Sequence, residues 1–161
     1  MQLCGVIKNR YDDATVMERP QEILVDVIGL GAGVVDRLRE QNLPVRGINV
    51  SESPSSRKNY LNLRAELWFA IKEWLAQRDC RLPIDDELVS ELAAPLYKYT
   101  STGKIKIESK EEMKKRGIKS PDKADALALT MASSAASFSG SESVFGYNFK
   151  KPLKSRIIRV G

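Results

Sequence analysis

The sequence contains no histidine, and this absence narrows the chemistry that is open to the protein. Zinc sites built on histidine, and catalysis by Ser/His or Cys/His pairs, are excluded within the chain. The two cysteines, Cys4 and Cys80, lie too far apart in sequence to form a metal-ligand motif. Any catalysis would therefore depend on carboxylates, lysines, hydroxyl groups or a hard metal ion.

Long apolar runs are also lacking. No segment approaches the length of about 20 apolar residues that a membrane-spanning helix needs, so no membrane association is expected. Lys8, Asn9 and Arg10 interrupt the apolar start of the chain, which argues against a signal peptide. We therefore expect a cytoplasmic protein with reduced thiols.

Size and charge set few further limits. The 161 residues are enough for one hydrophobic core. Basic residues outnumber acidic ones, and the formal net charge is +5. This charge suits a polyanionic partner without requiring one, because many basic proteins bind no nucleic acid.

A β-α-β pattern stands out near the start of the chain. Residues 23–28 form an apolar run that contains one acid, Asp26, and such a run predicts a strand buried on both faces. A glycine-rich turn at 29–33 leads into an amphipathic helix that ends near Gln41, and residues 45–50 form a second strand. This order predicts a right-handed parallel crossover.

Asp26 is open to two interpretations, because a buried and unpaired carboxylate is costly and must be compensated. It either caps the glycine turn from the carboxyl end of its strand, or it is a metal ligand beside a second acidic cluster. The glycines do not fit a dinucleotide-binding fingerprint, since Val34 stands where the third glycine is required. We expect them to let the helix pack close to the strand.

The rest of the chain shows helical periodicity and one hairpin signal. A short strand is considered at 3–7 with a turn at 11–13, helices are predicted at 57–77, 85–94, 110–116 and 121–137, and a hairpin is predicted from 96–99 and 105–108. Ser109 and Glu112 have the spacing of a capping box, and Gly117 would end the helix that follows them.

Two carboxylates lie at the start of the last of these helices. Ser120 can cap the free amides there, and Pro121 suits the first helical position. Asp122 and Asp125 are three residues apart, so they share one face. The helix dipole explains Asp122 in the first turn, but it explains Asp125 less well. The pair predicts half of a divalent-metal site, with Asp125 as the first choice of ligand and Asp26 as the best candidate for the other half.

A dense basic region surrounds the hairpin and borders the acidic pair. A solvated charged face is the usual explanation, although a nuclease would need such a patch to hold phosphates while carboxylates bind Mg²⁺. The candidate DNA-binding residues are Lys104, Lys106, Lys110, Lys114, Lys115 and Lys119. Arg116 and Lys123 belong to the same basic region.

Several segments together resemble the nuclease domain of the large subunit of tailed-phage terminases, the DNA-packaging motors. They are residues 19–38 around Asp26, 60–68, 82–83, 86–88, the hairpin, 108–110, and 120–127 around Asp125. The resemblance covers roughly residues 19–135, with these segments in the family's order and spacing.

The resemblance implies an α/β fold of the ribonuclease H-like class, in which helices flank a mixed sheet, with the β-hairpin near the cleft. It implies endonucleolytic cleavage of double-stranded DNA during phage genome packaging, with two Mg²⁺ or Mn²⁺ ions held by acids from three elements. By motif, Asp26 corresponds to the second acid, and Asp125 or Asp122 to the acid of the last helix. Implied partners are double-stranded DNA and the terminase motor domain, small subunit or portal.

The chain departs from the family at its start. The family opens with a strand that carries the first metal-binding aspartate, followed by two more strands and a helix. Residues 5–16 faintly resemble that opening, but Ile7 stands where the aspartate is expected. We therefore expect a truncated nuclease-like domain over residues 1–137, with 1–18 as a degenerate start and 138–161 as a Ser/Gly-rich and basic tail.

Two functions follow from these observations. The leading hypothesis is a phage- or prophage-encoded nuclease of the host cytoplasm, whose incomplete site holds two, one or no divalent ions. The alternative is a catalytically inactive prophage remnant that binds DNA or protein. In both cases missing strands would leave an exposed sheet edge through which the chain could form a homo-oligomer.

Overall fold

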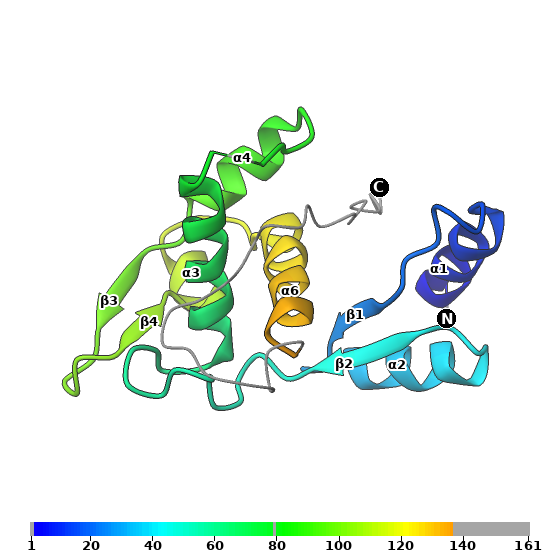
Figure 1. Cartoon of the computed structure of the whole chain (residues 1–161). Helices are drawn as coiled ribbons and strands as arrows, with labels where there is room; N and C mark the ends of the chain where they lie inside the picture. The colour runs from blue at the N-terminus through cyan, green and yellow to red at the C-terminus, as the bar shows by residue number, and fades with distance from the viewer. Residues whose placement is uncertain (1, 79, 137–161) are drawn as a thin grey trace. The chain divides into compact units, whose positions relative to one another are not determined.

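The computed structural model describes residues 2–78 and 80–136 (Figure 1). They fall into two compact units, unit 1 up to Val50 and unit 2 from Ser51. The single domain expected over 1–137 remains a prediction, and the tail expected at 138–161 lies outside the described residues. Within those residues, no helix is long and apolar enough to cross a membrane.

Unit 1 is built on a two-stranded parallel sheet. β1 (Ile23–Asp26) pairs with β2 (Val45–Ile48), with Ile23 opposite Val45 and Asp26 opposite Ile48. α2 (Gly31–Glu40) connects the two strands and packs on both of them. The predicted parallel β-α-β unit is confirmed, although its helix already begins inside the glycine turn.

A helix, α1 (Gln2–Asp13), precedes this sheet. The strand considered at 3–7 and the turn at 11–13 are therefore wrong. Cys4, Ile7 and Tyr11 recur at helical spacing and pack into one core with α2, so burial of a helix face overrides the β-propensity of the segment. This core consists of Cys4, Leu38 and Leu43, with Ile7, Tyr11, Ile23, Val25, Val34 and Val45 packed against it.

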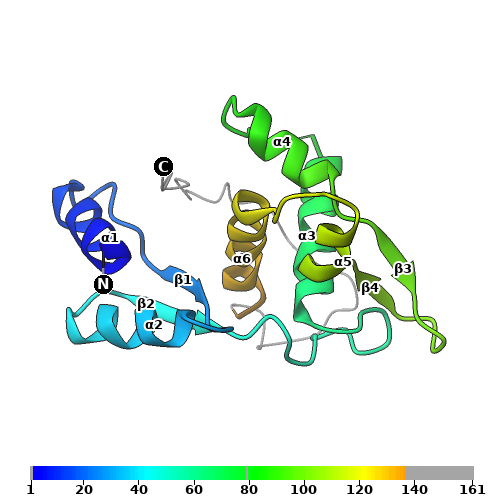
Figure 2. The ribbon, with the colours of Figure 1, turned by 180° about the vertical axis from the view of Figure 1, so that it is seen from behind.

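Two helices, α3 (Leu63–Ala76) and α6 (Asp122–Ala136), lie side by side at the centre of unit 2 (Figures 1 and 2). Their buried apolar side chains are Ala65, Leu67, Trp68, Ala70 and Ile71 of α3 and Ala124, Leu127, Ala128, Met131 and Ala132 of α6. The Asn62 side chain accepts a hydrogen bond from the Ala65 N–H at 3.1 Å. This cap starts α3 at Leu63, later than the predicted start at Arg57.

The predicted hairpin forms beside these helices. β3 (Tyr97–Tyr99) pairs antiparallel with β4 (Ile105–Ile107). Tyr60 forms a bridge to Ile105 on the other side of β4, and the Leu61 N–H donates to the Ile105 carbonyl at 2.9 Å. β4 is therefore flanked on both sides, and β3 is the outer strand.

Two short helices complete unit 2. α4 (Asp86–Ala93) packs on α6, and α5 (Lys110–Lys115) follows the hairpin. The predicted capping box of α5 is confirmed, since Ser109 and Glu112 each accept a hydrogen bond from the other's N–H. Gly117 follows the helix with a φ of 75°, as its predicted role requires.

Candidate functional site

Asp26 is the last residue of β1 and is half-buried. Its Oδ1 accepts a hydrogen bond from the Ile28 N–H at 3.0 Å, so the carboxylate caps the turn that leads to α2. The capping role predicted for Asp26 is therefore confirmed, and its role as a metal ligand stays a prediction. By strand alternation its side chain shares a face with that of Leu24, opposite to the face of Ile23 and Val25 that packs into the core of unit 1.

Gly31 brings α2 unusually close to the Asp26 main chain. A Cβ atom at Gly31 would lie 1.7 Å from the Asp26 carbonyl oxygen, a distance that no side chain tolerates. A Cβ at Gly33 would meet nothing within 4 Å. Close helix–strand packing, as predicted, therefore depends on Gly31 and not on Gly33.

Asp125 lies at the start of α6 and is held by three N–H donors. Its Oδ1 accepts from Trp68 Nε1 at 2.9 Å, from Arg64 Nη2 at 3.1 Å and from Arg64 Nε at 3.3 Å. The Asp125 side chain is 20% exposed and that of Arg64 is 15% exposed. The carboxylate is therefore fixed in direction, and hydrogen bonds from charged and aromatic donors offset its partial burial.

Arg64 ties this carboxylate to the hairpin. Its Nη1 donates to the Glu108 carbonyl at 2.7 Å, and its guanidinium lies 5.8 Å from the centre of the Trp68 ring. The planar guanidinium thus joins α3, α6 and the end of β4 in one network. Sequence reasoning missed Arg64 and the polar role of Trp68, because both lie about 60 residues before Asp125 and no local pattern links them.

Asp122 has a much more open environment. Its side chain is 70% exposed, and its Oδ1 accepts from the Ser120 hydroxyl at 2.6 Å. Lys110 Nζ lies 3.6 Å from Asp122 Oδ1 and 3.3 Å from Asp125 Oδ2. One ammonium group is therefore shared by the two carboxylates of the predicted pair.

The amides at the start of α6 are capped by a distant carboxylate. Glu91 of α4 accepts from the Lys123 N–H at 2.7 Å and from the Ala124 N–H at 3.0 Å. Ser120 donates its hydroxyl hydrogen to Asp122 instead, so its predicted capping role is not what the structure shows. The Pro121 carbonyl accepts from the Asp125 N–H at 2.8 Å, which puts Pro121 one place before the first helical residue.

The Lys110 ammonium occupies the place beside Asp122 and Asp125 where a metal ion would bind. Lys110 Nζ lies within 3.6 Å of both carboxylates, and its side chain is half exposed. Two carboxylates are a ligand set that Mg²⁺ accepts when it keeps several waters, so the chemistry of the pair is compatible with one divalent ion. Among the described residues no three acidic or cysteine side chains gather to hold a metal. Asp26 belongs to unit 1, whereas Asp122 and Asp125 belong to unit 2, and each unit is described separately.

Two of the candidate DNA-binding lysines besides Lys110 are also engaged in ion pairs. Lys106 Nζ lies 3.6 Å from Glu112, and Lys119 Nζ lies 3.2 Å from Glu87. The Lys119 pair is exposed, and such pairs are weak and can open toward a phosphate, whereas the Lys106 pair is half-buried. Within the described part of the chain, the candidates without a carboxylate partner are Lys104, Lys114 and Lys115.

Arg116 and Lys123 have structural partners instead. Arg116 donates to Glu108 at 2.7 and 2.6 Å, which lowers the pKa of Glu108 and raises that of Arg116. Lys123 pairs with Glu87 and Asp85, and these hydrogen bonds raise the pKa of Lys123. Both cations therefore serve to fasten α5 and α6 to neighbouring segments.

Similarity to known proteins is found by comparison of structure and not by comparison of sequence. No family model matches the chain, and no curated protein matches it in sequence. The nuclease domain of the large terminase subunit gp2 of bacterial virus Sf6 matches with a TM-score of 0.59 and 25% identity, over 70% of this chain. The chain has the fold of a terminase nuclease domain. It is a mixed α/β fold of the ribonuclease H-like class, as predicted.

Mutant forms of that phage domain match equally well. A mutant with manganese gives a TM-score of 0.59 and 24% identity, and a mutant with calcium gives 0.58 and 25%. Each covers 70% of this chain. This chain spans about 65% of the phage domain's length, so it shares a large part of that fold and not all of it.

The early strands of the fold are reduced here. Within the described residues no strand precedes β1, and α1 stands where the resemblance places the helix before the Asp26 strand. Residues 5–16 therefore do not form the opening strand that their sequence faintly resembles. Ile7, expected at the position of the first aspartate, lies instead in α1 and packs against the core of unit 1.

Proposed function

We propose that this chain is a terminase large-subunit nuclease domain, which cleaves double-stranded DNA during phage genome packaging with the help of Mg²⁺ or Mn²⁺. The observation that supports the proposal is the fold shared with a phage terminase nuclease domain, a mutant form of which was solved with manganese. The acids Asp26 and Asp125 stand on the elements that the resemblance assigns to metal ligands. The proposal places the protein in the cytoplasm of a bacterial host, with motor domain, small subunit or portal as partners.

The chain's own residues would divide the work of binding and orientation. Trp68 and Arg64 hold Asp125 Oδ1, which leaves Oδ2 and the exposed Asp122 to face a cation. Lys110 balances this negative charge until the cation arrives. A bound divalent ion would supply charge stabilisation and a more acidic water at the scissile phosphate. The nearby exposed lysines would hold the DNA backbone.

The direct test is incubation of the full chain with supercoiled plasmid and Mn²⁺, followed by electrophoresis of nicked and linear products. We expect cutting that stops with a chelator and is lost in Asp125→Asn, which keeps an oxygen for Trp68 and Arg64 but removes the charge. The matched control is Asp36→Asn, since Asp36 is an exposed acid of α2. Cutting that survives Asp125→Asn would contradict the site assignment.

A second function, a non-catalytic module that binds DNA or packaging proteins, is favoured by one observation. Both oxygens of Asp125 already have donors or a cation, and the described residues offer no third ligand for a metal. This alternative predicts salt-sensitive binding of duplex DNA without cleavage, and binding that is unchanged in Asp26→Asn. The plasmid assay and a duplex-binding titration together separate the two functions.

A further inference from the structure

Four aromatic rings form a continuous row on the hairpin side of unit 2. Tyr60 and Phe69 have ring centres 5.6 Å apart, Phe69 and Tyr97 lie 5.3 Å apart, and Tyr97 and Tyr99 lie 6.2 Å apart. The rings come from the 59–61 segment, from α3 and from β3. We call this set the aromatic row.

The outer half of the row is open to solvent. Tyr97 is 51% exposed and Tyr99 is 66% exposed, although each ring contacts the next. Both lie on β3, the outer strand of the hairpin sheet. Edge-to-face contacts fix the orientation of such rings and cover only part of their surface, as the exposed fractions of Tyr97 and Tyr99 show. Two large rings are therefore kept ordered and uncovered, which an ordinary surface residue is not.

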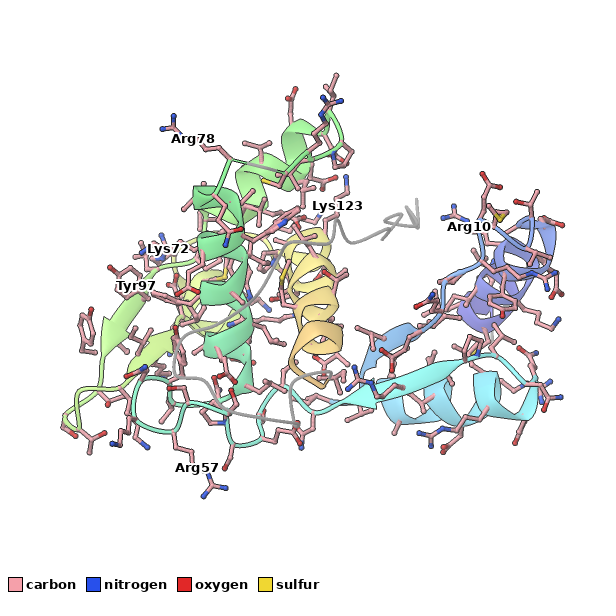
Figure 3. All side chains as sticks on the ribbon, in the orientation of Figure 1. Arg10, Arg57, Lys72, Arg78, Tyr97 and Lys123 are labelled. Carbon is pink, nitrogen blue, oxygen red and sulfur yellow. The ribbon has the colours of Figure 1, made fainter. Side chains whose placement is uncertain are left out.

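The surroundings of the aromatic row are positively charged. Lys72 lies over the Phe69 ring at 5.1 Å, and Figure 3 shows its side chain on the same side of α3 as that of Tyr97. Neither residues 57–61 nor residues 96–107 contain an acid. The cations of these two segments are Arg57, Lys58, Lys98, Lys104 and Lys106.

Only some of these cations form ion pairs within the protein. Lys98 and Lys106 lie opposite each other in the hairpin and share Glu112 on the other face of the sheet. Arg57, Lys58 and Lys104 have no carboxylate partner among the residues that the structure describes. Arg57 projects away from the ribbon in Figure 3. Lys72 therefore places a cation directly at the aromatic row, and Arg57 and Lys58 add positive charge in the segment that precedes Tyr60.

Uncovered aromatic rings beside free cations match one ligand chemistry, a flexible polyanion with flat bases. Single-stranded DNA stacks its bases on such rings while lysines and arginines track its phosphates. Duplex DNA keeps its bases stacked within the helix, so it would use the cations and not the rings. A second copy of this chain would bring the same positive charge against the patch.

We propose that the aromatic row and its bordering cations form a binding surface for single-stranded DNA. The surface does not include Asp26, Asp122, Asp125 or Lys110, and it needs no metal. Its function therefore stands independently of the nuclease proposal. It would hold an unpaired segment or a frayed end on the hairpin side of unit 2.

Fluorescence anisotropy with a labelled oligothymidine strand, at low salt and with chelator, tests the proposal. We expect binding that Tyr99→Leu weakens about tenfold, since stacking contributes roughly 1–3 kcal/mol per base. Tyr99→Phe keeps the ring and should bind like the wild type. Lys72→Gln removes the cation beside Phe69 and should flatten the dependence of log Kd on log salt by about 0.7, the share of one phosphate on a single strand.

Control measurements keep the result unambiguous. Thermal melts show whether each variant folds, and Asp125→Asn should bind the strand like the wild type even if nuclease activity is lost. No strand binding, or equal binding by Tyr99→Leu, would overturn the proposal. The same holds if a duplex of equal length binds more tightly, or if Tyr99→Leu abolishes self-association instead, which would assign the row to a second copy.

Discussion

Gly31 shows how a single residue sets the geometry next to a candidate ligand. Its Cα hydrogens face the Asp26 carbonyl, where a methyl group would overlap the oxygen. The helix therefore starts directly behind the carboxyl end of β1. This closeness fixes the turn that Asp26 caps through the Ile28 amide.

We expect Gly31→Ala to destabilise the protein, because strand and helix must separate to admit the new methyl group. Forced overpacking of this kind costs typically about 1–3 kcal/mol. Urea unfolding followed by circular dichroism measures the change. Gly33→Ala is the matched control on the same helix, and since its Cβ would be free of contacts it should stabilise by roughly 0.5–1 kcal/mol. Equal effects of the two substitutions would contradict the packing argument.

Trp68 combines core packing with a hydrogen bond to Asp125. Trp68→Phe keeps an aromatic ring but leaves the carboxylate with one donor fewer. A hydrogen bond to a charged group contributes about 1.5–3 kcal/mol, and we expect a loss of unfolding free energy of that order. The control is Trp74→Phe on the same helix, whose indole donates no hydrogen bond among the described residues. A smaller loss for Trp68→Phe than for Trp74→Phe would show that the hydrogen bond adds little.

At the scale of elements, α5 depends on its capping box. The Ser109 N–H, Lys98 and Lys106 all stabilise the ionised Glu112 carboxylate, and they lower its pKa from 4.5 to about 2. Because the folded pKa is depressed, this contribution to stability is complete above pH 4.5 and is lost as the pH falls toward 2. The hairpin and α5 are therefore joined by an acid-sensitive link.

We expect Glu112→Gln to unfold with a weaker pH dependence than the wild type between pH 4.5 and 2. Urea midpoints at several pH values across this window measure the difference. Glu73→Gln, an exposed change on α3, should follow the wild-type curve. Parallel curves for Glu112→Gln and the wild type would contradict the assigned role. Some acid sensitivity should remain, because Arg116 also lowers the pKa of Glu108.

At the scale of the whole molecule, the sheet of unit 1 has two strands within the residues that the structure describes. In a parallel pair, alternate N–H groups of β1 point away from β2, and those of Leu24 and Asp26 have this direction. A strand edge of this kind can pair with another chain. The homo-oligomer stays a prediction, and we propose the β1 edge as the place where two copies would pair.

We expect the mean molar mass from light scattering to rise with protein concentration, and Leu24→Pro to suppress the rise by removing one edge N–H. The control is Val89→Ser, an exposed change on α4. Serine is used because a proline at this position would break the helix. A constant monomer mass for the wild-type protein at high concentration would rule out edge pairing.

The elements that depend on local order were predictable from sequence. The β-α-β unit, the hairpin, the capping box and the helix that carries Asp125 follow from side-chain periodicity, turn residues and spacing over a few residues. α1 was not predictable in this way. The short apolar stretch at 3–7 suits a strand or a helix, and the core formed with Leu38 and Leu43 decides between them.

The sequence by itself determined the β-α-β order, the candidate acids and the basic character of the hairpin region, because these depend on residue types at short range. Only the tertiary structure decided what each acid contacts. Glu91 caps α6, Arg64 and Trp68 fix Asp125, and Lys110 lies between the two carboxylates, all through contacts across long sequence separations. Hydrogen bonds and ion pairs act over a few ångströms in space, so packing alone selects the partners.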